Sequence, residues 1–339
     1  MKSNKLNIFV CLTCGIAIFS LIFFTMGTDS LIKNILSLKL NWILVALACM
    51  VAFWLLESLA LHILIKSTNK KFTYFKSLKV NMGGQYFHSI TPFASGGQPF
   101  QAYYLNKQGV ELGIAINCLV AKFIIYQLAL VVVSVVLMVL RLSYFSEYVN
   151  NFSFLAIIGF VVNLTVMLWA VSLVFFKKTT RRVACFIIKI LAKIHIVKNT
   201  ESKIDYLDNE LEKFSNCFHE MIKDIPSMLG AFGVSVLHLL AYMTVPYMIY
   251  RAFGLTEVDL ITIVSAQAFV MLISSFIPIP GAGVGAEGAF YLFFNRFFPA
   301  EGQIGLALVL WRLITFYFTV LVGVFFAFGA NKKTSKLEE

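Results

Sequence analysis

The stretch LITIVSAQAFVMLISSFIPIPGAGVGAEGAFYLFFNRFF, residues 260–298, decides how the chain must fold. It is apolar at both ends, and two prolines and four glycines interrupt its middle. Proline removes a helix hydrogen bond, and glycine weakens a helix interior. At membrane depth, irregular backbone is tolerated only where protein or water covers it. The stretch therefore predicts a broken hairpin, either re-entrant or a pair of short spans, rather than one spanning helix.

The composition of the whole chain places this hairpin in a membrane. Of 339 residues, 59% are apolar and 13% are charged, and the mean hydropathy is +0.83. A soluble domain has about 25% charged residues. The net charge of +11 would fit a nucleic-acid partner, but the basic residues stand in short segments between apolar runs. That distribution is typical of membrane orientation, so we expect an all-α polytopic integral membrane protein.

The chain forms a single predicted transmembrane domain over residues 1–339. A spanning helix needs about 20 apolar residues. Lys2 and Lys5 precede the first such run as in a signal peptide, but no clear small-residue cleavage site follows, so we expect it to be retained. A second broken hairpin is predicted at 76–105. The predicted full spans are 6–26, 42–65, 113–140, 153–176, 227–250 and 304–330.

The loop charges predict the orientation. If both termini and the segments 66–80, 106–111 and 177–225 lie inside, that side has 21 Lys and Arg residues and the other side has five. This asymmetry predicts N-in and C-in. The two hairpins then enter from opposite faces, which is typical of an inverted-repeat transport site. At residue level the repeat is weak: Pro92 before Gly96-Gly97-Gln98 parallels Pro280 before Gly283, Gly285 and Glu287.

The polar insert 177–225 predicts two amphipathic helices on the cytoplasmic side. The first has an apolar stripe from Val183 to Ile194, and its basic residues lie off that stripe. Such a helix lies at the surface of an anionic leaflet. The second has apolar residues at alternating three- and four-residue steps, so it packs back on the first or pairs with another subunit. A covering helical hairpin is the simpler interpretation.

Motifs for enzyme chemistry are mostly missing. The sequence has no GxxxxGK[ST] loop, no GxSxG elbow and no histidine pair at zinc spacing, and its five histidines are scattered. A GxGxxG match at Gly283, Gly285 and Gly288 follows an apolar Pro-rich run rather than a strand, so it does not predict a dinucleotide site. Its glycines still permit close approach of a phosphate to a helix N-terminus. We predict no catalytic residue, no metal site and no cofactor.

Four charged residues within the apolar runs are the more specific signal. They are Glu57, Lys122, Glu287 and Arg312. A charge at the bilayer centre costs about 2.5–3.5 kcal/mol on insertion scales, so these residues should pair and face protein or water. They either fix helix packing or line a substrate path, and we favour the path because Glu287 lies in a broken hairpin. Lys122 alternatively snorkels to the interface. We expect Arg312 to pair with Glu287, and a lipid phosphate to compete for Arg312.

The glycine- and proline-rich motifs resemble a known family. Thr91-Pro92 through Gly96-Gly97-Gln98-Pro99-Phe100, together with Pro278-Ile279-Pro280-Gly281 through Gly285-Ala286-Glu287-Gly288 and Trp311-Arg312, resembles the lysyl-phosphatidylglycerol synthase transmembrane family. The resemblance covers about residues 5–330. The family is the flippase module of bacterial multiple-peptide-resistance proteins. It implies movement of lysyl-phosphatidylglycerol from the inner to the outer leaflet of a bacterial cytoplasmic membrane, and resistance to cationic peptides.

The expected site follows from the motifs and the buried charges. The two adjacent glycines of the first motif permit backbone angles closed to other residues. Glu57 and Lys122 are the expected intramembrane charge partners. The expected lipid-binding and translocation residues are Gly96, Gly97, Gln98, Pro99, Pro280, Gly283, Gly285, Glu287 and Arg312.

Two other functions stay open. Full-length relatives carry a soluble domain that transfers lysine from lysyl-tRNA to phosphatidylglycerol, but only Asn331 to Glu339 follow the last predicted span here. One alternative is nevertheless a phosphatidylglycerol lysyltransferase, which would bind tRNA. The other is a membrane scaffold for a separate lipid-modifying enzyme. The expected partners are anionic or aminoacylated phospholipids, a second copy of the chain or that separate enzyme; nucleic acid is expected only for the lysyltransferase.

Overall fold

The computed structural model describes the chain from residue 34 onward, with gaps. It covers residues 34–148, 152–175, 181–182, 185, 218–275, 277, 279–300 and 302–329. All regular structure in these residues is helical. The predicted span 6–26 and nearly all of the predicted amphipathic hairpin 177–225 lie outside them.

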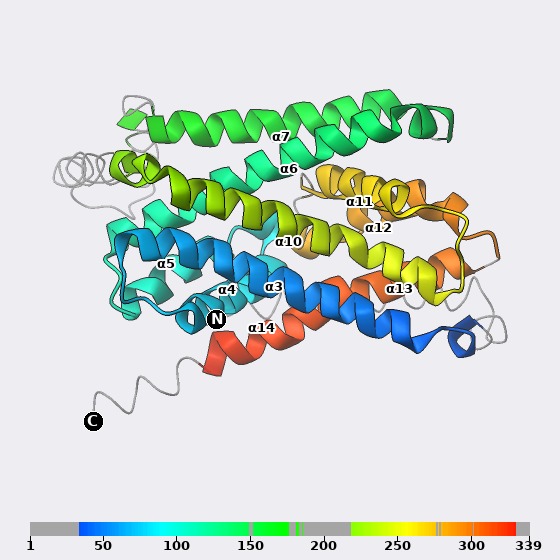
Figure 1. Cartoon of the computed structure of the whole chain (residues 1–339), viewed down its shortest axis with the longest axis horizontal. Coiled ribbons are helices and arrows are strands. Elements are labelled where there is room, and N and C mark those ends of the chain that lie inside the picture. The colour runs from blue at the N-terminus through cyan, green and yellow to red at the C-terminus, as the bar shows by residue number, and fades with distance from the viewer. Residues whose placement is uncertain are drawn as a thin grey trace, which may run out of the picture.

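Long apolar helices run along the longest axis of the molecule (Figure 1). Four stretches of the described chain are long and apolar enough to cross a membrane. The protein is therefore an all-α, multi-pass membrane protein, whereas the number of spans and their orientation stay predictions. The four stretches are α3 (Leu40–Thr68), α6 (Leu112–Tyr148), α10 (Ile225–Ala252), and a final run of α13 (Gln303–Arg312), the π-helical segment η4 (Leu313–Tyr317) and α14 (Phe318–Gly329). Helix α7 (Phe152–Phe175) contains a shorter apolar stretch.

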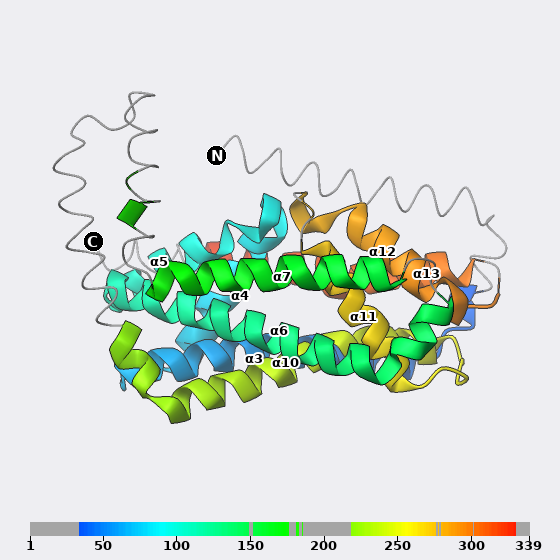
Figure 2. The ribbon, with the colours of Figure 1, turned by 90° about the horizontal axis from the view of Figure 1, so that it is seen from above.

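The two Gly/Pro-rich segments each fold as two helices joined by a short turn. Hairpin 1 consists of α4 (Tyr74–Ile90), the 3-10 turn η1 (Pro92–Ala94) and α5 (Gly97–Lys107). Hairpin 2 consists of α11 (Leu260–Ser274), the 3-10 turn η2 (Pro280–Ala282) and α12 (Gly285–Phe294), and the turn η3 (Asn295–Phe297) follows it. They approach from opposite ends of the molecule (Figures 1 and 2). Their tips, η1 and η2, are in contact near the middle.

The remaining helices pack around the hairpins in a pseudo-symmetric way. Helices α3 and α10 lie side by side and run antiparallel, and the Lys39 amide at the start of α3 donates to the Ala252 carbonyl at the end of α10 (2.8 Å). Helix α4 packs on α14, and α11 packs on α6. The first arm of each hairpin therefore contacts the helix that follows the other hairpin. The same packing arrangement is therefore present in both halves of the chain.

Small residues and aromatic stacking hold the hairpins in place. Gly323 of α14 faces Tyr86 and the Met82 carbonyl of α4 so closely that a Cβ there would lie 3.0 Å from the Tyr86 Cβ. Small residues allow this approach between membrane helices. In hairpin 2, the Phe290 ring of α12 stacks on the Trp311 ring of α13, with centroids 4.8 Å apart. Large apolar side chains on the outer faces, such as Val139 and Phe325, are exposed as lipid contact requires.

Candidate functional site

The tips of the two hairpins have the same local structure. Each begins with a proline at the first turn position, where a missing N–H costs nothing. In hairpin 1 the Ala94 amide donates to the Thr91 carbonyl (3.1 Å), and in hairpin 2 the Ala282 amide donates to the Ile279 carbonyl (2.9 Å). A second helix then starts at a glycine in both. The internal repeat that the motifs predicted weakly is therefore present as matching backbone structure.

Both tips contain backbone that L-residues rarely adopt. Phe93 and Ala94 in hairpin 1, and Ala282 and Val284 in hairpin 2, have φ between +52° and +68°. Such angles cost of order 1–3 kcal/mol per residue and persist only where the surroundings impose them. Part of this constraint in hairpin 1 comes from Thr91, whose hydroxyl accepts from the Gly96 amide (2.8 Å). Strained backbone of this kind concentrates at functional sites.

The glycines that start the second arms provide space rather than unusual angles. Gly96 has ordinary right-handed helical angles and Gly97 lies within a helix, so the pair does not use the special angles that glycine permits. A Cβ on Gly97 would instead overlap the His88 ring, and one on Gly285 would overlap Ile277. Gly97 therefore packs against α4, the first arm of hairpin 1, and Gly285 packs against Ile277, which lies between α11 and η2. Pro99 lies in the first turn of α5, where proline is tolerated.

A buried ion pair lies against hairpin 1. Lys122 Nζ on α6 is 2.9 Å from Glu57 Oε1 on α3, and both side chains are nearly nine-tenths buried. Lys122 also donates to Asn81 Oδ1 (2.7 Å), and Asn81 donates to Glu57 Oε2 (2.9 Å). Gln85 donates to the same carboxylate oxygen, and Gln101 of α5 donates to Asn81. Lys122 thus points inward to a partner, and the snorkelling alternative is wrong.

A second buried ion pair lies against hairpin 2. Arg312 Nε is 2.7 Å from Glu287 Oε1, and Arg312 Nη1 donates to the Gly281 carbonyl (3.1 Å). The guanidinium also lies over the Trp311 ring, 4.9 Å from its centroid. In the described part of the chain, Arg312 Nη2 and Glu287 Oε2 are buried without a hydrogen-bond partner. This pair therefore keeps free hydrogen-bonding capacity on both residues.

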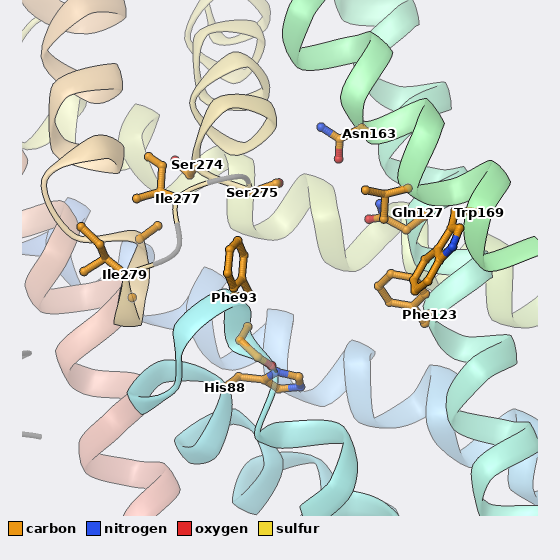
Figure 3. Close-up of a pocket in the computed structure, with 14 residues that line it drawn as sticks. His88, Phe93, Phe123, Gln127, Asn163, Trp169, Ser274, Ser275, Ile277 and Ile279 are labelled. Atoms are coloured by element: carbon orange, nitrogen blue, oxygen red, sulfur yellow. Dashed lines mark hydrogen bonds between the residues drawn. The ribbon is translucent and has the colours of Figure 1, made fainter. Parts of the chain in front are cut away.

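Two cavities meet at the tip of hairpin 1. The larger has a volume of about 700 Å³ and extends between both tips and helices α6 and α7 (Figure 3). Its walls are mainly apolar, with amides of Gln127 and Asn163 and hydroxyls of Ser274 and Ser275 among them. The smaller, of about 330 Å³, contains Glu57 and Lys122 in its lining. Phe93, which projects from η1, lines both cavities together with His88, Ala94 and Phe123.

The structure separates the expected site residues into three groups. Glu57, Lys122 and Gln98 line the smaller cavity. Glu287 and Arg312 form the second ion pair, and Gly281, to which Arg312 donates, lines the larger cavity. The remaining residues shape the tips and line neither cavity: Gly96, Gly97, Pro99, Pro280, Gly283 and Gly285. Pro278 lies outside the described residues.

Several polar residues at the site were not predicted. They include His88, Asn81, Gln85, Asn163 and His238. Asn163 is 1% exposed and donates to the Leu272 carbonyl of α11, so it connects α7 to hairpin 2. An amide within an otherwise apolar helix is the signal that would have found it, because such a group needs a buried partner.

These features define a multi-pass membrane protein with two broken hairpins that meet at mid-molecule, each with its own buried acid–base pair. Comparison with known proteins gives the family. The sequence profile of the lysylphosphatidylglycerol synthase TM region matches residues 11–323, and the chain belongs to that family. It is also similar to a UPF0104 membrane protein of Archaeoglobus fulgidus, with 26% identity over 294 residues, which cover 84% of this chain and 86% of the relative. The family predicted from the motifs is confirmed.

Proposed function

We propose that this protein moves a phospholipid or another lipid-linked anion, such as lysyl-phosphatidylglycerol, between the leaflets of a bacterial cytoplasmic membrane. The observation that carries the proposal is the contact of two oppositely directed hairpins, η1 against η2, beside a 700 Å³ cavity. Broken helices that meet near the middle of a membrane protein are where transporters bind substrate. Membership of the family supports a membrane module of this kind.

The larger cavity suits a lipid headgroup in transit. Its amides and hydroxyls offer hydrogen bonds, and the rest of its lining is mainly apolar. Trp169 at its edge is 57% exposed on the outer surface of α7, where lipid chains are expected. The headgroup then passes through protein while the acyl chains stay in the bilayer. Rocking of one hairpin against the other would open the cavity to each leaflet in turn.

Arg312 is the proposed contact for the lipid phosphate. Its planar fork binds phosphate through two parallel hydrogen bonds and stays charged when buried. One of its terminal nitrogens has no partner among the described residues. Glu287, near the N-terminus of α12, is stabilised by the helix dipole and holds the guanidinium when substrate is absent. Substrate binding therefore replaces one anionic partner of Arg312 by another.

The test is lipid translocation by purified protein in vesicles. Acyl-chain-labelled phosphatidylglycerol and lysyl-phosphatidylglycerol are incorporated, and accessibility of the label to an impermeant quencher is followed over time. We expect translocation above that of protein-free vesicles, with Arg312→Ala close to the protein-free level. Translocation no faster than in protein-free vesicles for both lipids would overturn the proposal. Lysyl transfer from lysyl-tRNA to phosphatidylglycerol by the same preparation would favour the lysyltransferase instead.

A further inference from the structure

The cations of the two buried ion pairs occupy corresponding places in the two halves of the chain. Lys122 lies on α6, which follows hairpin 1, and Arg312 ends α13, which follows hairpin 2. Each base reaches a buried acid beside its own hairpin, Glu57 with Asn81 of α4 in one half and Glu287 of α12 in the other. Glu57 lies on α3, before hairpin 1, and Glu287 lies on the second arm of hairpin 2. Each hairpin therefore has one ion pair packed beside it, and the charge of each pair sums to zero.

A set of rings lies beside the Glu57–Lys122 pair. Tyr126 stacks on His238 (5.6 Å between centroids), and His238 and Tyr242 both contact Phe53 (5.3 Å each). Glu57 interacts electrostatically with His238. Tyr126, His238 and Phe53 therefore line the smaller cavity with Glu57 and Lys122, and α10 also packs on α13, which Arg312 ends.

The smaller cavity has the features of a binding site for a small polar group. Its volume of about 330 Å³ corresponds to roughly ten water molecules, at about 30 Å³ each. His238 lines it, is 2% exposed, and has an Nδ1 atom without a hydrogen-bond partner in the described residues. Gln85, Gln98 and Gln101 add amides to the lining. The cavity therefore offers both signs of charge and an unused buried imidazole nitrogen.

We propose that the headgroup taken by this cavity is zwitterionic, with an ammonium and a phosphate, and that it exchanges first with the Glu57–Lys122 pair and then with the Glu287–Arg312 pair. This inference rests on the proposed function and names its substrate class. The ammonium takes the place of Lys122 at Glu57, and the phosphate takes the place of Glu57 at Lys122. Every buried charge keeps a partner during the exchange.

The physical reason is the cost of an unpaired buried charge. Removing one partner of a buried pair is strongly unfavourable, because the other charge is then left in a poorly solvating interior. A headgroup with only a negative charge pairs with Lys122 and displaces Glu57 from its strongest partner. A headgroup with both charges satisfies both residues. The Glu57–Lys122 and Glu287–Arg312 pairs are each neutral overall, and one lies beside each hairpin. The same headgroup can therefore bind at either pair, on either side of the hairpin tips.

The first experiment compares two lipids that differ in headgroup charge. Wild-type protein is reconstituted with acyl-chain-labelled phosphatidylethanolamine or phosphatidylglycerol of the same chain length, and translocation rates are measured with an impermeant quencher. We expect phosphatidylethanolamine to move at least about tenfold faster, which a small difference in barrier height suffices to produce. Equal rates, or faster movement of phosphatidylglycerol, would overturn the zwitterion proposal and leave lipid translocation standing.

The second experiment changes the charge of the cavity. Glu57→Gln keeps the shape of the side chain and leaves Lys122 as a net positive charge. We expect the rate ratio of phosphatidylethanolamine to phosphatidylglycerol to fall at least about tenfold, and phosphatidylglycerol to become the preferred lipid. A purely structural role would slow both lipids equally and leave the ratio unchanged. The matched control is Asp259→Asn at the exposed Arg141–Asp259 pair, which should not alter the ratio.

A binding measurement separates failure of this inference from failure of the proposed function. The thermal unfolding midpoint of detergent-solubilised protein is recorded with each lipid at equal concentration. A larger increase with phosphatidylethanolamine, without translocation of either lipid, would overturn the proposed function and support the headgroup class. An equal or larger increase with phosphatidylglycerol would overturn the headgroup class, whatever the translocation rates.

Discussion

Arg312 joins the last helical run to two parts of hairpin 2 at once. Its Nε lies 2.7 Å from Glu287 Oε1 on α12, and its Nη1 donates to the Gly281 carbonyl in the η2 turn. A single side chain therefore holds the second arm of the hairpin and its tip. The π-helical segment η4 starts directly after Arg312. Such segments are rare and frequent at functional sites.

Two substitutions of Arg312 distinguish the contribution of its positive charge from that of its planar guanidinium group. Arg312→Ala leaves Glu287 buried without its cation, so we expect a loss of about 3–5 kcal/mol in unfolding free energy together with loss of lipid translocation. Arg312→Lys retains the charge but lacks the planar fork, so it should fold and lose most of its activity. Translocation in vesicles and thermal unfolding in detergent are measured on the same preparations. Wild-type translocation by both Arg312→Lys and Glu287→Gln would mean that the pair is only structural.

Gly97 is predicted to be essential because the two arms of hairpin 1 pack closely together there. In Gly97→Val the new side chain overlaps the His88 ring, and such overpacking costs about 1–3 kcal/mol. We expect the variant to reach the membrane and to lose translocation. Gly233→Val on α10 is the matched control, because nothing lies within 4 Å of a Cβ at Gly233.

A second substitution tests the cause of the Gly97→Val defect. If the clash with His88 displaces the second arm, His88→Ala in the Gly97→Val background should restore part of the translocation by making space. Normal translocation by Gly97→Val alone would show that the close contact between the two arms at Gly97 is not part of the transport mechanism.

The topology is tested with single cysteines in a background that lacks the six native ones. Lys70 precedes hairpin 1, and Glu147 lies near the far end of α6. The asymmetry of 21 to five basic residues predicts that a cysteine at Lys70 is protected from an impermeant thiol reagent in intact cells. A cysteine at Glu147 should be labelled. The reverse pattern would contradict the N-in orientation.

Asp259 should contribute stability in a pH-dependent way. It caps α11 by accepting from the Ile261 and Thr262 amides, and it pairs with Arg141 (2.6 Å). Partial burial raises the pKa of this carboxyl, but hydrogen bonds from Thr262 and Arg141 outweigh that effect and lower the pKa overall. Asp259→Ala should therefore cost about 1 kcal/mol of unfolding free energy at neutral pH, as loss of a helix cap does.

The pH dependence of that difference has a defined sign. Because the pKa is lower in the folded state, the stabilisation is present above the usual aspartate pKa of about 3.9 and disappears as the pH falls through the lower folded value. Thermal unfolding of wild type and Asp259→Ala is compared across this range. A difference that stays constant into strong acid would mean that the carboxylate charge contributes nothing.

The sequence by itself determined the class of fold. Apolar runs longer than about 20 residues have no place in water, so they predict membrane helices, and α3, α6 and α10 are helices in the structure. Proline and glycine act locally, so the breaks at Pro92 and Pro280 were also predictable. The four buried charges were predictable as two acid–base pairs, because a buried ion in lipid requires a partner.

The tertiary structure decided what surrounds those charges. Asn81 and Gln85 reach Glu57 only because α4 packs against α3, and His238 reaches the same cavity only because α10 does. The role of Gly97 depends on its close contact with His88 on the other arm of hairpin 1. Local sequence does not specify which residues of two helices come into contact. Contacts between residues far apart in the chain depend on helix packing, and an apolar helix surface in lipid leaves many packings open until small residues and buried polar groups select one.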